Sequence, residues 1–345
     1  ARAAFTPNGG AERWTAFGRD GYGRIIAERR WEGLNVSYEY DAAGNRTAIV
    51  WPDAWRAEYS YDPLNRMTEV RGGAPGSVVV LARYDYDARS RRTQLRFGPN
   101  AAAPVSSITY GWQADSDLEQ LTHAFSGQNV TFTNSFDGSG RLTGQAASSP
   151  AWLWRPPAST TQTYAVANEL DQYPSVDGQT LTWDGRGNLT AYAGLSLSYD
   201  SANRLVGASR ASVGAFTASY AFDGLDRRVA RTGSGAGVSA VRFVHAGGEE
   251  IAEVDPASNT VLRRYVPGPG TDQPVAYIET VGGPATYCYH RDRLGNIIAL
   301  ASASGSLAER YLYFPFGVES PLVTTGQPPR YNAWRSVPKA EWQRE

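Results

Sequence analysis

The sequence is poor in the residues that most often carry catalysis or metal binding. It has one cysteine, Cys288, and three histidines, at 123, 245 and 290, among 345 residues. A single cysteine excludes an internal disulfide and a cysteine-based metal cluster. Cys288 and His290 are two residues apart and therefore share one strand face, but a metal site needs three or four ligands. We interpret them as a buried thiol beside a hydrogen-bonded histidine, and we expect no metal and no cofactor.

An excess of charge and long apolar runs are also missing. The chain has 33 Lys and Arg against 34 Asp and Glu, and Lys339 is the only lysine. This balance creates no net field toward nucleic acid, and no apolar run of about 18 residues predicts a transmembrane segment. No signal segment is visible, and the chain begins at Ala1 rather than at a methionine. We therefore expect a piece of a longer polypeptide.

Aromatic residues, glycine and proline are abundant instead. There are 20 Tyr, 36 Gly and 20 Pro, and aromatics make up 12% of the chain. Tyrosine favours strands, while glycine and proline favour turns. No segment longer than about ten residues keeps a helical apolar spacing without Gly or Pro interrupting it. These features predict an all-β fold.

One ten-residue phrase recurs along the chain. It reads YEYDAAGNRT at residues 38–47 and YSYDPLNRMT at residues 59–68. Such self-similarity is the signature of a repeat architecture. Aligned on the aspartate, the clear copies are Asp20, Asp41, Asp62, Asp87, Asp137, Asp184, Asp200, Asp223 and Asp292, and decayed copies are centred on Gln113 and Asn168.

Each column of the phrase has a physical cause. The aromatics at one and three residues before the aspartate share a strand face. The aspartate can accept hydrogen bonds from the backbone N–H groups that follow it, as in a type I turn. The third residue after it suits positive φ, and the fourth is Arg or Asn in every clear copy. The third column holds Gly23, Gly44, Asn65, Gly140, Gly187, Asn203, Asp226 and Gly295, with Ser90 as the exception.

The phrase therefore predicts a strand, a tight turn and a returning strand. Because the same aspartate stands at many turns, we interpret it as a structural residue and expect no catalytic one. The acidic group at Glu249, Glu250, Glu253 and Asp255 lacks the alternating ligands of a calcium loop. We interpret it as a solvated hairpin edge.

These repeats resemble the YD repeats of the Rhs and YD-repeat protein family. The most specific blocks are residues 167–209, 220–279 and 289–317, and the resemblance covers about residues 14–317. It implies a long antiparallel sheet of YD hairpins that spirals around a hollow, as a partial shell or cocoon. Family members include toxin-complex components and Rhs effectors, whose shell encloses a C-terminal toxin, and more distantly the teneurins.

The chain departs from the family where its chemistry would lie. After the sequence FPFG at residues 314–317, the family's aspartate-dependent self-cleavage motif is not found. We therefore expect no enzyme. The predicted organisation is a YD-repeat shell segment over residues 1–317, with an irregular insert at 144–163 and the start of the Rhs core region at 287–317. A divergent, irregular tail follows at residues 318–345.

The resemblance implies a non-catalytic scaffold that encapsulates or presents a partner, such as a toxin or effector segment of the same or another polypeptide. It also implies a secreted or cell-surface bacterial protein, delivered by a secretion system or toxin complex. Two alternatives remain open: an adhesive module that binds glycans, and a fibre that self-associates through its sheet edges. Trp152 and Trp154, in the insert, are the candidate ligand contacts.

Overall fold

The computed structural model describes residues 2–5, 13–100, 102–153, 162–212, 214–313 and 319–320. Within these ranges the chain forms antiparallel strands and one short 3-10 helix, η1 (Pro150–Trp152). The predicted all-β fold is confirmed, but its strands form two 13-stranded sheets rather than one continuous sheet. In both sheets each strand pairs with the next strand of the chain, as expected for successive hairpins.

The first sheet contains β1 (Arg2–Phe5), β2 (Arg13–Arg19), β3 (Ile25–Arg30), β4 (Val36–Tyr40), β5 (Arg46–Val50), β6 (Arg56–Tyr61), β7 (Met67–Gly73), β8 (Val79–Tyr86), β9 (Arg92–Phe97), β10 (Ser106–Trp112), β11 (Leu118–Phe125), β12 (Gln128–Phe136) and β13 (Leu142–Ala147). The second contains β16 (Thr182–Trp183), β17 (Leu189–Tyr192), β18 (Leu195–Tyr199), β19 (Leu205–Arg210), β20 (Phe216–Phe222), β21 (Arg228–Gly235), β22 (Val241–Ala246), β23 (Glu249–Val254), β24 (Val261–Val266), β25 (Ala276–Glu279), β26 (Ala285–Arg291), β27 (Ile297–Ser302) and β28 (Leu307–Arg310). Two small hairpins are β14 (Ser175–Val176) with β15 (Gln179–Thr180), and β29 (Leu312–Tyr313) with β30 (Glu319–Ser320).

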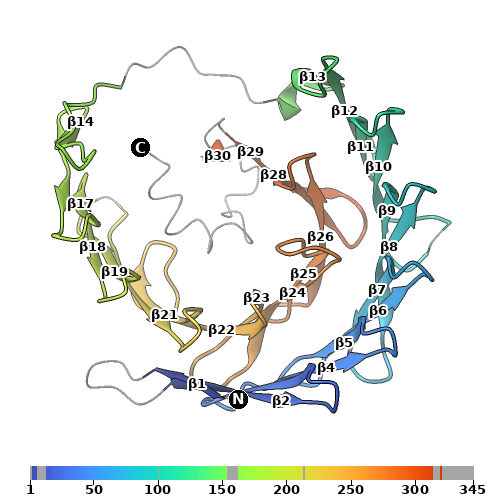
Figure 1. Ribbon diagram of the computed structural model, residues 1–345, viewed down its shortest axis with the longest axis horizontal. Coiled ribbons are helices and arrows are strands. Elements are labelled where there is room, and N and C mark those ends of the chain that lie inside the picture. Colours follow the sequence, from blue (N-terminus) through green and yellow to red (C-terminus); the bar gives the residue numbers. More distant parts are fainter. Residues whose placement is uncertain are drawn as a thin grey trace.

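Both sheets curve strongly along their length. Figure 1 shows the first sheet rising from β2 at the bottom to β13 at the upper right. The second sheet begins on the left at β17, passes β1 and β2 at β22, and continues inside the first sheet as β23–β28. The described strands thus follow an open ring that becomes two layers thick where the second sheet runs along the first. We call the first sheet the outer layer and strands β23–β28 of the second sheet the inner layer.

A β-bulge in each repeated hairpin accounts for the curvature. In the hairpin around Asp62, Tyr61 lies opposite Met67 and Ser60 lies opposite Glu69, so Thr68 is an extra residue in the returning strand. A bulge bends its strand and increases the local twist, so bulges at one position of successive hairpins curve the whole sheet. The same register shift occurs at Gly18/Arg19, Glu39/Tyr40, Asp85/Tyr86, Gly111/Trp112, Ser135/Phe136, Thr182/Trp183, Ser198/Tyr199, Ala221/Phe222 and His290/Arg291.

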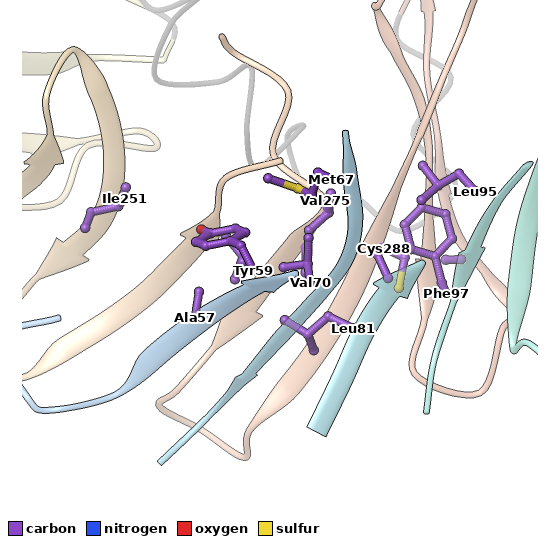
Figure 2. Close-up of a cluster of buried hydrophobic side chains, with 14 of the residues drawn as sticks. Ala57, Tyr59, Met67, Val70, Leu81, Leu95, Phe97, Ile251, Val275 and Cys288 are labelled. Carbon is purple, nitrogen blue, oxygen red and sulfur yellow. The ribbon is translucent and has the colours of Figure 1, made fainter. Parts of the chain in front are cut away.

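The largest core fills the space between the two layers. Figure 2 shows side chains of the first sheet, among them Tyr59, Val70 and Phe97, in the same cluster as Val275, directly before β25, and Cys288 of β26. Because strand residues alternate between faces, each strand contributes every second side chain to this core. Trp51 is 2% exposed and donates its indole N–H to the carbonyl oxygen of Ile251, 3.0 Å away in the inner layer.

The two layers approach closely at Gly305, in the turn after β27. Its carbonyl oxygen accepts a hydrogen bond from the backbone N–H of Ser126 at 2.8 Å. Its φ is +81°, and a Cβ at this position would lie 1.8 Å from the carbonyl oxygen of Val105. Only glycine therefore fits the turn without moving the backbone of the outer layer.

Gly305→Ala is expected to lower the free energy of unfolding by about 1–3 kcal/mol more than Gly282→Ala, because the added methyl group overpacks the contact. Gly282 is the matched control, since its φ is +84° and nothing lies within 4 Å of its added Cβ. Urea unfolding of both variants measures the difference. Equal losses would show that backbone strain alone, and not contact between layers, makes glycine necessary at residue 305.

The predicted insert and tail are only partly described. Strand β13 continues to Ala147, so the irregular stretch starts later than residue 144. Residues 154–161, including Trp154, lie outside the described residues. Of the predicted tail, Glu319–Ser320 pairs with β29, and the rest lies outside the described residues. The predicted domain boundaries stay predictions.

Candidate functional site

The repeated turns all lie at the same end of the strands in each sheet. Each turn joins a strand that runs toward that end to the next strand, which runs back. We call this set of turns the turn row. In the turn at Asp20, the Oδ1 atom accepts hydrogen bonds from the backbone N–H groups of Tyr22 and Arg24, both at 3.0 Å. The Oδ2 atom accepts one from the guanidinium of Arg24 at 2.7 Å. Positive φ occurs at Gly23, Gly44, Asn65, Ser90, Ser116, Gly140, Asp171, Gly187, Asn203, Asp226 and Gly295.

Neighbouring turns of the row are hydrogen-bonded to one another. Arg66 binds its own Asp62 and also donates to the carbonyl oxygen of Asp87 in the next turn, at 3.1 Å. Where the fourth column holds asparagine, Asn45 donates to Oδ1 of Asn65 at 2.8 Å. The hydrogen bond from Arg66 holds the pKa of the Asp62 carboxyl below its usual value. The carboxylate is therefore ionised at neutral pH and occupied by the turn, and its anchoring role stays a prediction.

In five of the described hairpins, the aromatic residue directly before the turn position anchors the hairpin to the preceding one. Tyr61 donates its hydroxyl to the carbonyl oxygen of Arg46 at 2.9 Å, and Tyr86 donates to that of Met67 at 2.9 Å. In each case the acceptor is the fifth residue after the aspartate of the preceding turn. Further examples are Tyr40 to Ile25, Trp112 to Arg92 and Trp183 to Tyr173.

These hydrogen bonds were not predicted from the sequence, which indicated only a shared strand face. One signal was available: the column prefers Tyr and Trp, which carry a donor, over Phe. Phe136 lacks one, and there Asn134, two residues earlier, donates its side-chain amide to the carbonyl oxygen of Leu118 at 2.8 Å. Leu118 again stands five residues after the turn position, at Gln113. The acceptor is thus retained while the donor changes.

Tyr86→Phe is expected to lower the free energy of unfolding by about 0.5–1.5 kcal/mol, the usual net value of one buried or half-buried hydrogen bond. Tyr22→Phe is the control, since 88% of Tyr22 is exposed. Chemical denaturation of both variants at neutral pH gives the two values. The anchoring role is wrong if the two substitutions have the same effect.

A buried polar cluster, which we call the clasp, joins the inner layer to the first strands of the outer one. Glu28 in β3 accepts hydrogen bonds from the hydroxyl of Tyr38 and the backbone N–H of Gly247, both at 2.7 Å. It also accepts one from the guanidinium of Arg227 at 2.9 Å. Arg227 in turn binds Asp223, the aspartate of a repeated turn, which is fully buried here. Burial alone would lower the pKa of Arg227, but the two carboxylates outweigh it and raise that pKa.

The clasp was not predicted, because Glu28 and Arg227 are far apart in the sequence and Glu28 follows no motif. In the clasp, the turn at Asp223 both closes its own hairpin and contacts the outer layer. The arginine that elsewhere reaches the next turn binds Glu28 as well as the carbonyl oxygen of Gly247. The Asp223 turn therefore docks one end of the inner layer onto the outer layer.

A second polar contact between the layers joins two of the three histidines. His123 Nδ1 in β11 and His290 Nδ1 in β26 lie 3.2 Å apart, and His290 Nε2 lies 3.1 Å from the Ser106 hydroxyl. Serine beside histidine can form a nucleophile and base, but Ser106 is 3% exposed and both histidines are fully buried. Burial lowers the pKa of His123 to about 3 and lowers that of His290 well below its ordinary value. The group thus joins the layers rather than meeting a substrate.

The remaining predicted site residues have mixed outcomes. Cys288 is buried, and burial raises the pKa of its thiol to about 12. The acidic group is not a solvated edge, since Glu250 and Glu253 are 5% and 3% exposed. That interpretation was wrong, because β23 lies between β22 and β24 in the second sheet and Glu253 accepts hydrogen bonds from Arg263 and Tyr265. The described residues contain no group of three or more His, Cys, Asp or Glu positioned to hold a metal ion.

Trp152, a candidate ligand contact, is buried at the end of the two-layered region. It is 6% exposed and stacks on Phe125 with ring centroids 5.8 Å apart. The guanidinium of Arg310 lies 5.6 Å from its ring centroid. The aromatic surface therefore packs against the protein itself, and ligand contact by Trp152 and Trp154 stays a prediction.

These features define a repeat protein in which antiparallel hairpins, anchored one to the next, build a curved two-layered wall. The RHS Repeat family model matches residues 40–77, which contain the hairpin around Asp62. The resemblance to Rhs and YD-repeat proteins is thereby confirmed. Among the described residues, no helix has the length and apolarity needed to cross a membrane.

Comparison with known proteins finds similarity to one curated protein and to several solved structures. The tRNA3(Ser)-specific nuclease WapA of Bacillus spizizenii is 24% identical over 291 residues, which are 82% of this chain and 11% of WapA. The structure of TcdB2-TccC3-Cdc42 matches with a TM-score of 0.43 and 17% identity, over 90% of this chain and 18% of that one. The Photorhabdus luminescens Tc holotoxin pore matches with a TM-score of 0.36 and 16% identity, over 89% of this chain and 18% of that one. The chain thus spans 11% to 18% of the length of each of these proteins.

Proposed function

We propose that this chain is a non-catalytic wall segment of a larger shell that encloses a partner polypeptide, most directly a toxin segment. The observation that carries this proposal is the use of the repeated polar residues. The aspartates, arginines and aromatics of the phrase hold turns and neighbouring hairpins together, so the repeats extend a wall rather than assemble one reactive centre. A curved sheet of this kind presents one face inward along its whole length.

The similarity to WapA supports the toxin as cargo, because a protein named as a nuclease contains a region like this chain in about a tenth of its length. On this proposal the nuclease activity of that relative resides outside the matching region. The shell would be secreted or injected together with its cargo. Among the described residues, no observation favours glycan binding or a fibre over this function.

The test uses the full natural polypeptide that contains residues 1–345. A specific protease site is placed between this chain and the flanking segment, the site is cut, and the product is analysed by size-exclusion chromatography. We expect the cut segment to stay with the shell under native conditions and to separate in denaturant. A segment that elutes alone under native conditions would contradict enclosure, as would a natural polypeptide with no further segment and no copurifying partner.

A further inference from the structure

Strand β13 is the last strand of the first sheet and forms an edge of that sheet, although the chain continues beyond it into the second sheet. β13 pairs with β12 on one side, and no strand of the described part of the chain pairs with its other side. The side chains of β13 are exposed or half-buried throughout. The backbone N–H of Ser148 donates to the carbonyl oxygen of Thr131. Because antiparallel pairs alternate, Gln145 and Ala147 turn their backbone groups toward the open edge.

The turn row is incomplete at this edge. The guanidinium groups of Arg24, Arg66 and Arg91 each donate to a carbonyl oxygen of the following turn. Their side chains are 29%, 23% and 20% exposed. The equivalent Arg141 binds only Asp137 among the described residues, and its side chain is 81% exposed. In the equivalent arginines, the remaining guanidinium N–H groups donate to the carbonyl oxygen of the next turn, and Arg141 has no such acceptor among the described residues.

The row of aromatic anchors is incomplete at the same edge. After the turns at Asp20, Asp41, Asp62, Asp87 and Asn168, the fifth residue accepts a hydrogen bond from the aromatic side chain of the next hairpin. For the turn at Asp137 this residue is Leu142. No aromatic side chain of the described residues donates to its carbonyl oxygen, and Leu142 is 38% exposed.

We propose that the β13 edge is a docking site for one further hairpin of the same type, supplied by another polypeptide segment. Three features define the occupant: an extended strand for the open edge, an aromatic donor for the Leu142 carbonyl oxygen, and a turn carbonyl group for Arg141. A hairpin with the repeated phrase supplies all three at the correct spacing. An unrelated strand can use only the first, because sheet edges pair with extended chains in general. The proposal is independent of what the wall encloses.

The probe is a labelled cyclic peptide containing residues 55–73 of this chain, the β6–β7 hairpin with Trp55, whose carbonyl oxygen accepts from the N–H of Trp51, the residue equivalent to Ala147. The peptide is closed so that it is already folded. Fluorescence anisotropy with the purified chain is expected to show saturable binding. Ala147→Pro is expected to abolish it, because proline removes the outward N–H without touching the pairing to β12. Arg141→Ala, and Tyr61→Phe in the peptide, are each expected to weaken binding by about tenfold, the loss of one hydrogen bond of about 1.4 kcal/mol.

The control is Arg293→Ala, which alters a turn arginine of the second sheet and is expected to leave binding unchanged. Unfolding midpoints show that each variant is folded. The proposal is overturned if the cyclic peptide does not bind, or if it binds Ala147→Pro and Arg141→Ala as well as it binds the unmodified chain. Weakening by Ala147→Pro alone would overturn the specificity for a YD hairpin and leave an unspecific edge.

Discussion

Replacing Glu28 with alanine is expected to lower the free energy of unfolding by about 3 kcal/mol, the cost of breaking a buried ion pair on one side. Glu28 is 1% exposed and binds Tyr38, Gly247 and Arg227. Without it, Arg227 keeps Asp223 and the Thr15 hydroxyl in β2 as partners but loses its charged partner on the outer layer. Urea unfolding at pH 7 measures the loss.

Glu39→Ala is the matched control for this substitution. Glu39 also accepts a hydrogen bond from an arginine, Arg56, at 2.9 Å, but the two side chains are 54% and 28% exposed. An exposed pair of this kind contributes at most about 1 kcal/mol. If Glu28→Ala were no more destabilising than Glu39→Ala, the clasp would not hold the two layers together.

Lowering the pH from 7 to 5 is expected to destabilise the protein through its buried histidines. The Nδ1–Nδ1 hydrogen bond between His123 and His290 requires the accepting ring to be neutral, and burial favours the neutral form of both rings. Burial lowers the pKa of His123 to about 3 and lowers that of His290 and His245 well below the ordinary value. The unfolded chain binds protons below about pH 6.5, while the folded chain does not.

The sign of the effect follows directly. Stability is full above about pH 6.5 and is lost as the pH falls below it, by at most about 1.4 kcal/mol per pH unit for each histidine. The turn aspartates do not interfere between pH 7 and 5, because their hydrogen bonds lower pKa values that already lie below this window.

The environment of the histidine pair contains no compensating carboxylate among the described residues. His123 packs on Phe125 and Phe132, and His290 packs on Phe97 and Phe125. The double variant His123→Leu/His290→Leu should therefore have a shallower dependence of stability on pH, with His245 still titrating. An unchanged slope would contradict the assignment.

The turns could be predicted from the sequence in detail because they are local. Aspartate, a left-handed residue and arginine lie within five residues, and their spacing defines one hydrogen-bonded turn. Ser116 and Asp171 have positive φ in the decayed copies as well, so the geometry persists where the letters of the phrase have changed. The aromatic anchors could be predicted only in part. The aromatic residues directly before the turn aspartates indicate a strand face, but they do not indicate the carbonyl acceptor on the preceding hairpin.

The contacts between layers could not be predicted, because they depend on the curvature of the sheet. Repeated bulges fix how far each hairpin turns, and only their sum decides which strands of the second sheet meet the first. His123 and His290 are 167 residues apart, and Glu28 and Arg227 are 199 apart. No local pattern marks such partners. The error at Glu250 and Glu253 has a different cause, since β23 has a neighbouring strand on each side and the partners of Glu253, Arg263 and Tyr265, lie on the neighbouring strand β24.

Protection of the flanking segment from trypsin in the full natural polypeptide tests the central claim most directly, which is that the hairpin wall acts by enclosure. The unmodified shell is expected to leave the segment intact, while Glu28→Ala, which opens the clasp, is expected to expose it to cleavage at a rate that follows the loss of stability. Glu39→Ala should protect the segment as the unmodified shell does. Equally fast cleavage in all three proteins, at the rate of the isolated segment, would contradict the claim.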